Sequence, residues 1–88
     1  MYFIDKNRIF WRKIEEETVI LDIESGYYFN LDDVSTLIWQ GLVEERSVEE
    51  IVEMICSEFE IDRKVALQDV KQMLKSLEKE NIIKLGEK

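Results

Sequence analysis

Apolar and polar residues alternate with a period of two in the first third of the chain, which is typical of β-strands. We predict three strands within residues 8–31. The first ends at Ile14, the second covers 18–23, and the third covers 27–31. A charged turn joins the first two, and a hairpin turn whose positive φ Gly26 can supply joins the last two. The alternation of the middle strand gathers three apolar side chains on one face: Val19, Leu21 and Ile23.

The third predicted strand combines aromatic side chains with an open edge. Its alternation places Tyr27, Phe29 and Leu31 on one face and Tyr28 and Asn30 on the other. Because it is an outer strand of an antiparallel meander, one edge keeps unpaired backbone N–H and C=O groups. Two interpretations remain open. Either a C-terminal segment or a second copy of the chain covers this edge, or an extended peptide adds to it as a fourth strand.

From Asp32 onward the apolar positions recur every three to four residues, which predicts helices. The expected helices cover about 33–44, 47–58 and 62–80. Asp32 or Asp33 can cap the first helix, Ser47-Val48-Glu49-Glu50 is a capping box for the second, and Asp62 can cap the third. The apolar residues at 82–85 form a short terminal strand or pack against the rest.

The order β-β-β-α-α-α predicts one α+β domain over residues 1–88, in which a three-stranded antiparallel N-terminal sheet precedes three helices in a winged helix-turn-helix-like arrangement. In such proteins the third helix is usually the recognition helix. Its core face is expected to hold four apolar side chains, those of Ala66, Val70, Met73 and Leu77. Leu67 and Leu74 lie on the flank, beside Lys71. They either complete the core contact or line one wall of a groove beside the sheet.

Composition narrows the possible functions. The 88 residues carry a net charge of −8 and include no histidine, which excludes Ser-His and Cys-His catalytic pairs and imidazole metal sites. The one cysteine, Cys56, cannot form an internal disulfide, and we expect it to be a packing residue. We find no signal peptide and no apolar run of about 20 residues. We therefore predict a cytoplasmic protein that is not an enzyme, needs no cofactor or metal, and does not enter a membrane.

The charge pattern argues against nucleic acid as a partner. The segment 63–79 carries five basic and two acidic residues, but 44–62 carries eight acidic residues and only Arg46. That acidic segment contains the helix that would cross a phosphate backbone, so DNA would be repelled on approach. The basic shoulder of the third helix would better suit an acidic or mixed-charge peptide.

Several short motifs resemble those of one known family. They are Asp22, Gly26-Tyr27-Tyr28-Phe29, Leu31-Asp32, Ile38-Trp39 followed by Gly41-Leu42, and Ser47-Val48-Glu49-Glu50-Ile51. Together they resemble the PqqD family, also called the RiPP recognition element, over about residues 8–85. The sequence departs from the family pattern at Asp32, where asparagine is common, but both residue types can cap the following helix.

The resemblance implies a non-catalytic module that binds the leader region of a ribosomally made precursor peptide and presents it to modifying enzymes. The leader is expected to add as a strand in the groove between the third strand and the third helix. By position, the strand residues that would contact it are Tyr27, Tyr28, Phe29, Asn30 and Leu31. From the helix, Leu67, Lys71 and Leu74 would line the groove, with Arg63 near its end.

Free-standing members of this length resemble two known cases. One is the recognition protein of lasso-peptide clusters, which works beside a leader peptidase and a cyclase. The other is the chaperone of pyrroloquinoline quinone biosynthesis, which works with a radical SAM enzyme. We favour the lasso type because the tails are short and the strand is aromatic. A homodimerisation domain that uses the same strand edge, and a winged-helix DNA-binding domain, are the alternatives.

Overall fold

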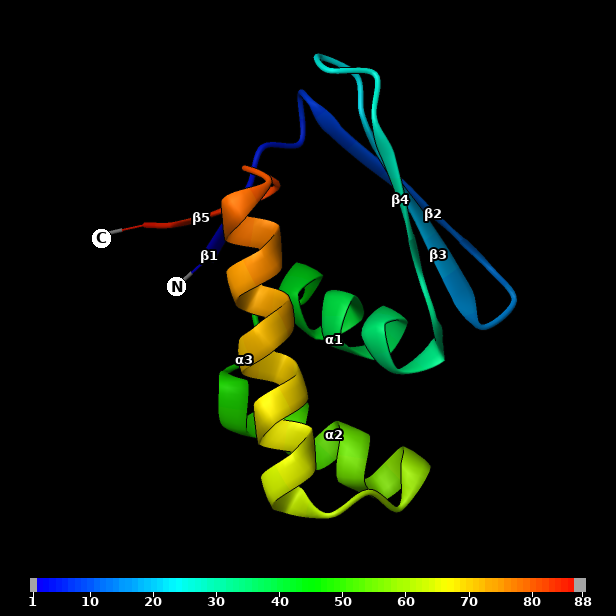
Figure 1. The fold of residues 1–88 in the computed structure, drawn as a ribbon, viewed down its shortest axis with the longest axis vertical. Coiled ribbons are helices and arrows are strands. Elements are labelled where there is room, and N and C mark those ends of the chain that lie inside the picture. The colour runs from blue at the N-terminus through cyan, green and yellow to red at the C-terminus, as the bar shows by residue number, and fades with distance from the viewer. Residues whose placement is uncertain (1, 87–88) are drawn as a thin grey trace.

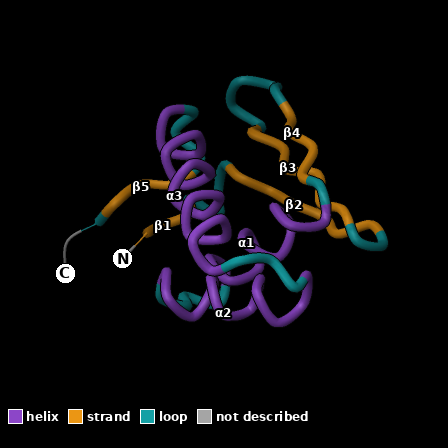
Figure 2. Tube along the Cα trace, turned by 60° about the horizontal axis from the view of Figure 1, so that its bottom comes forward, coloured by secondary structure: helices purple, strands orange, loops and turns teal. Residues whose placement is uncertain are grey.

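The computed structural model describes residues 2–86 and has the predicted α+β architecture (Figure 1). Along the chain the elements are β1 (Tyr2–Ile4), β2 (Ile9–Ile14), β3 (Glu17–Asp22), β4 (Tyr28–Leu31), α1 (Asp33–Val43), α2 (Val48–Phe59), α3 (Arg63–Lys79) and β5 (Ile83–Leu85). The three helices pack together, with the β2-β3-β4 sheet on one side and a ribbon of β1 and β5 on the other (Figure 2). The expected order of three strands and three helices is confirmed, and β1 is an additional strand that the sequence analysis missed.

The sheet is an antiparallel meander in the order β2-β3-β4. Its register aligns Trp11, Ile20 and Phe29 across the three strands. This row faces the helices, since Ile20 is fully buried and the two aromatic side chains pack against the core. Gly26, in the turn between β3 and β4, has a φ of +82°, as predicted.

The middle strand β3 has a regular row of apolar side chains on one face, but the face that it buries is the other one. Thr18, Ile20 and Asp22 are buried, whereas Leu21 and Ile23 are exposed. Leu21 and its neighbours do share one face, but it is the outer one. Both faces of this segment carry β-branched or apolar residues, so the period of two defines the faces without telling which of them turns inward.

The C-terminal strand β5 pairs with β1 and not with the meander. The pairing is antiparallel, with Tyr2 opposite Leu85 and Ile4 opposite Ile83. Of the two fates considered for residues 82–85, a short terminal strand is therefore the one observed. Because its partner is β1, it leaves the outer edge of β4 uncovered.

The helix starts follow the capping prediction at two of three positions. Asp32 caps α1 by accepting a hydrogen bond from the Ser35 N–H at 2.9 Å. In the capping box of α2, Ser47 Oγ accepts from Glu50 N–H at 3.1 Å and Glu50 Oε1 accepts from Ser47 N–H at 2.9 Å. Asp62 does stand at the N-cap of α3, but its side chain accepts no capping hydrogen bond. The prediction for that side chain was wrong.

The core lies where the helices meet the inner face of the sheet. Trp39 on α1 is 2% exposed and meets Trp11 of β2 edge to face, with ring centroids 5.3 Å apart. α1 also crosses α2 closely: an added Cβ at Gly41 would lie 2.5 Å from Ile51 Cγ1. Cys56 on α2 is half-buried against the core, as expected of a packing residue.

Candidate functional site

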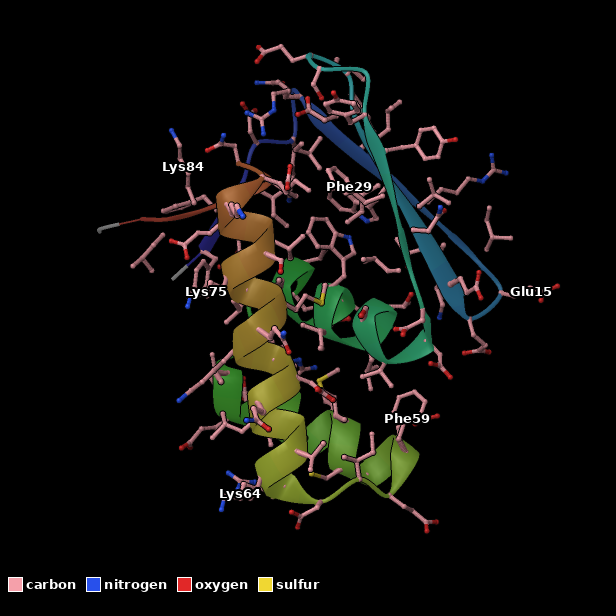
Figure 3. The ribbon with its side chains drawn as sticks, viewed as in Figure 1. Glu15, Phe29, Phe59, Lys64, Lys75 and Lys84 are labelled. Carbon is pink, nitrogen blue, oxygen red and sulfur yellow. The ribbon has the colours of Figure 1, made fainter. Side chains whose placement is uncertain are left out.

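A groove lies between β4 and α3, with the first turn of α1 at its base. It encloses about 520 Å³. β4 contributes Phe29, Asn30 and Leu31 to its lining, and α3 contributes side chains from three successive turns, with Glu80 following at its C-cap. Figure 3 shows Phe29 in the space between β4 and α3. The groove therefore joins a strand to a helix that is distant in sequence.

One side of the groove is an open strand edge. Among residues 2–86, β4 pairs with β3 alone. The Asp22 N–H donates to the Tyr27 carbonyl at 2.9 Å, which fixes the phase of the antiparallel ladder. Because bonded residues alternate in such a ladder, Phe29 and Leu31 point their backbone groups toward β3. The N–H and C=O groups of Tyr28 and Asn30 therefore point outward along the free edge.

The lining of the groove is apolar at its floor and polar at its rim. Ile38, Leu77 and Ile82 form a buried floor. Phe29, Leu31 and Met73 are half-buried above it and pack against the core. The rim carries the polar side chains Asn30, Asp32, Ser35, Asp69, Gln72, Ser76 and Glu80. An open edge beside half-buried apolar side chains offers an extended chain both backbone hydrogen bonds and hydrophobic contacts.

The strand half of the predicted site lies at this groove. Phe29, Asn30 and Leu31 line it. Tyr27 and Tyr28 flank it and are 70% and 66% exposed. Tyr27 contributes instead to a neighbouring depression near the β3–β4 turn.

The helical half of the predicted site lies elsewhere. Leu74 is only 5% exposed and belongs to the core, and Leu67 packs against that core. Lys71 is exposed, and Arg63, at the start of α3, forms an ion pair with Glu53 at 3.2 Å. None of these four residues lines the groove, so the structure does not bring them together with the strand residues.

The reason is that the groove runs along the other shoulder of α3. The buried stripe of Ala66, Val70, Leu74 and Leu77 has a flank on each side. Leu67 and Lys71 lie on one flank, and Asp69, Gln72, Met73 and Ser76 lie on the other, which faces β4. Met73, which was expected on the core face, packs partly against the core and also lines this wall.

Three residues, Arg8, Asp22 and Asn81, form a polar clasp that lines the depression next to the groove. The Asp22 carboxylate accepts a hydrogen bond from the Glu24 N–H at 3.0 Å and lies 3.3 Å from Arg8 Nε. The Arg8 guanidinium also donates to the Asn81 carbonyl, just beyond α3. The clasp thus ties the turn after β3 to the end of α3. It gives the motif residue Asp22 a structural role.

The clasp also shifts the acidity of Asp22. Partial burial of the carboxyl acts to raise its pKa. The backbone N–H groups of Glu24 and Ser25 and the charge of Arg8 oppose burial and outweigh it. The pKa of Asp22 consequently lies below its ordinary value of 3.8.

Residues 2–86 contain no group of three or more acidic, cysteine or histidine side chains that could hold a metal ion. The described helices are all too short or too polar to cross a membrane.

Comparison with known proteins agrees with the geometry. Residues 17–83 match the family described as coenzyme PQQ synthesis protein D (PqqD). The chain therefore belongs to the PqqD family, as its motifs indicated. Curated proteins gave no match.

Two solved structures are similar over almost the whole chain. One is TbiB1 in complex with the TbiA(beta) leader peptide, with 30% identity, a TM-score of 0.85, and coverage of 98% of this chain and 100% of that one. The other is lasso peptide synthetase B1 complexed with the leader peptide, with 30% identity, a TM-score of 0.81, and coverage of 97% and 98%. Both relatives thus have this fold and were solved with a leader peptide bound.

Proposed function

We propose that this protein binds the leader region of a ribosomally synthesised precursor peptide, which adds as a strand to β4 in the groove beside α3. The observation that carries the proposal is the open edge of β4 along a partly apolar groove. Support comes from the two relatives of the same fold, each of which is complexed with a leader peptide.

The open edge of β4 and the apolar side chains of the groove would contribute differently to the binding free energy of the leader. The N–H and C=O groups of Tyr28 and Asn30 offer up to four backbone hydrogen bonds, each worth a net ~1 kcal/mol. That sum is offset by the cost of ordering and immobilising the peptide. Useful affinity therefore needs apolar anchors worth about 1.5–3 kcal/mol each. Phe29, Leu31 and Met73 are the side chains placed to receive them.

We further propose that the protein has no catalytic role and presents the bound precursor, in the cytoplasm, to a leader peptidase and other modifying enzymes of the lasso-peptide type. The similarity to lasso peptide synthetase B1 favours this pathway over delivery to a radical SAM enzyme. A leader held as an extended strand keeps the residues beyond it accessible, which is what a separate peptidase or cyclase requires.

The test is a fluorescence-anisotropy titration with the leader segment of the precursor peptide encoded beside the gene. A scrambled peptide and a DNA duplex are the controls. Saturable binding of the leader alone, at micromolar concentration or better, supports the proposal. Equal binding of the scrambled peptide refutes sequence-specific recognition. Failure of the leader to bind, together with dimerisation in light scattering at rising concentration, would assign the β4 edge to self-association instead.

A further inference from the structure

The charged side chains of the groove share one sign. Three of its lining residues are ionisable, and all are acidic: Asp32, Asp69 and Glu80. No lysine or arginine lines it. Within residues 2–86, none of these three carboxylates forms an ion pair. The carbonyl end of α3, which favours cations, and the N-terminal turn of α1, which favours anions, both lie here, so the charge of the groove is set by its carboxylates.

Three of the five basic residues of α3 lie on its other side, whereas Lys79 falls at the edge of the groove-lining arc. On a helical wheel Lys64, Lys71 and Lys75 fall within about 40° of one another, more than 90° from the centre of the groove-lining arc. Figure 3 shows Lys64 and Lys75 on the side of α3 turned away from β4. The net positive charge of α3 therefore does not describe the surface that a peptide in the groove would meet.

Asp69 is the acidic residue best placed to select a ligand. Asp32 already accepts the capping hydrogen bond of α1, and Glu80 is exposed at the end of α3. Asp69 is half-buried in the groove wall, and its carboxylate accepts no hydrogen bond from residues 2–86. Since partial burial reduces screening by water, a cation brought beside this carboxylate is bound more strongly than at the open surface.

We propose that the groove selects an extended peptide segment that carries a lysine or arginine, and that Asp69 recognises this side chain. The inference rests on the proposed function and names the class of leader that the groove accepts: apolar side chains for the floor and a basic side chain for the α3 wall. It replaces the acidic or mixed-charge peptide that the composition of the third helix suggests.

The experiment measures Kd for the leader segment of the neighbouring precursor with the wild-type protein and with Asp69→Asn, Asp69→Lys and Glu78→Gln. Glu78→Gln is the matched control, because it removes one negative charge from α3 at an exposed position outside the groove. Each lysine or arginine of the leader is also replaced by glutamine, one at a time. Circular dichroism confirms that each variant keeps its helices.

We expect Asp69→Asn to raise Kd about 3- to 10-fold, the scale of one partly desolvated ion pair, and Glu78→Gln to change it less than about 2-fold. Asp69→Lys should weaken binding further. One of the leader variants with a glutamine substitution should bind the wild-type protein as weakly as the parent leader binds Asp69→Asn. The Kd of that leader variant should be the same for Asp69→Asn as for the wild type.

Two other results would distinguish failure of the charge selection from failure of the proposed function. A leader that binds the wild type but contains no basic residue, or that responds equally to Asp69→Asn and Glu78→Gln, overturns the charge selection and leaves leader binding intact. A leader that does not bind the wild-type protein at all overturns the proposed function, and the charge selection with it.

Discussion

Two adjacent residues of α3, Met73 and Leu74, are expected to separate binding from stability. Leu74 is 5% exposed in the core, and Met73 is half-buried in the groove wall. Leu74→Ala should cost about 2–5 kcal/mol of unfolding free energy, because it leaves a cavity among buried neighbours. A domain of this size loses about 4–8 °C in Tm per kcal/mol, so its Tm should fall by roughly 8–40 °C.

Met73→Ala should instead weaken binding of the leader. The substitution removes three heavy atoms, worth about 0.8 kcal/mol each when fully covered. Part of the side chain is already covered in the free protein, so about half of this sum, roughly 1.2 kcal/mol, comes from the peptide. The expected rise in Kd is about 5- to 10-fold. The loss of stability should stay near 1 kcal/mol, because the residue lies at the rim of the core.

Thermal unfolding by circular dichroism and anisotropy titration of the leader, well below both midpoints, measure the two effects. Leu74→Ala should bind within about 3-fold of the wild type where it is folded. The opposite result, in which Leu74→Ala stays stable but loses the leader while Met73→Ala binds normally, would refute the assignment. The peptide would then lie on the Leu67 side of α3.

Three further substitutions test the turn, the strand edge and the helix crossing. Asp22→Asn should lower the free energy of unfolding near neutral pH. Because the pKa of Asp22 is lowered in the folded protein, the difference from the wild type should shrink as the pH falls below the ordinary value of 3.8 and vanish below the pKa in the folded protein. A difference that does not change with pH in urea titrations would contradict this. Asn30→Pro removes a backbone N–H that points outward from β4 and breaks no hydrogen bond to β3. It should raise the Kd of the leader at least about 10-fold and leave the circular dichroism spectrum unchanged. Normal binding of the leader would exclude strand addition at this edge. Gly41→Ala should lower the urea midpoint, because the added methyl lies 2.5 Å from Ile51 Cγ1 and overpacking of about 1–3 kcal/mol exceeds the ~1 kcal/mol gain in helix propensity. Gln40→Ala, at an exposed position of the same helix, is its control and should have little effect.

Features that depend on local sequence were predicted well. The capping box at Ser47 requires only residues three positions apart, and both of its hydrogen bonds are present. The positive φ of Gly26 follows from the hairpin turn that it helps to form. The order of the three meander strands and three helices follows from the change of hydrophobic period at Asp32. Each of these signals is contained within a few neighbouring residues.

Features that depend on distant contacts were missed or misplaced. β1 has three residues and exists because it pairs with β5 at the other end of the chain. A strand of that length carries almost no periodic signal of its own. The sheet also decides which shoulder of α3 faces the groove, and both shoulders carry an apolar residue, Leu67 on one and Met73 on the other. A helical wheel alone therefore cannot predict which of the two sides of α3 faces the groove.

The same limit applies to charge. A count over α3 gives an excess of positive residues, yet the side of the helix that faces β4 carries Asp69, and Lys64 and Lys75 lie on the side turned away. A bound peptide contacts one face of a helix and is screened from the opposite face by the protein and by salt. The acidic character from which we predict that DNA is not a partner is therefore not offset by the basic residues of α3 at the groove. For a small domain with an open strand edge, we therefore expect the helix face that packs beside that edge to set the charge of the ligand more directly than the overall composition of the helix does.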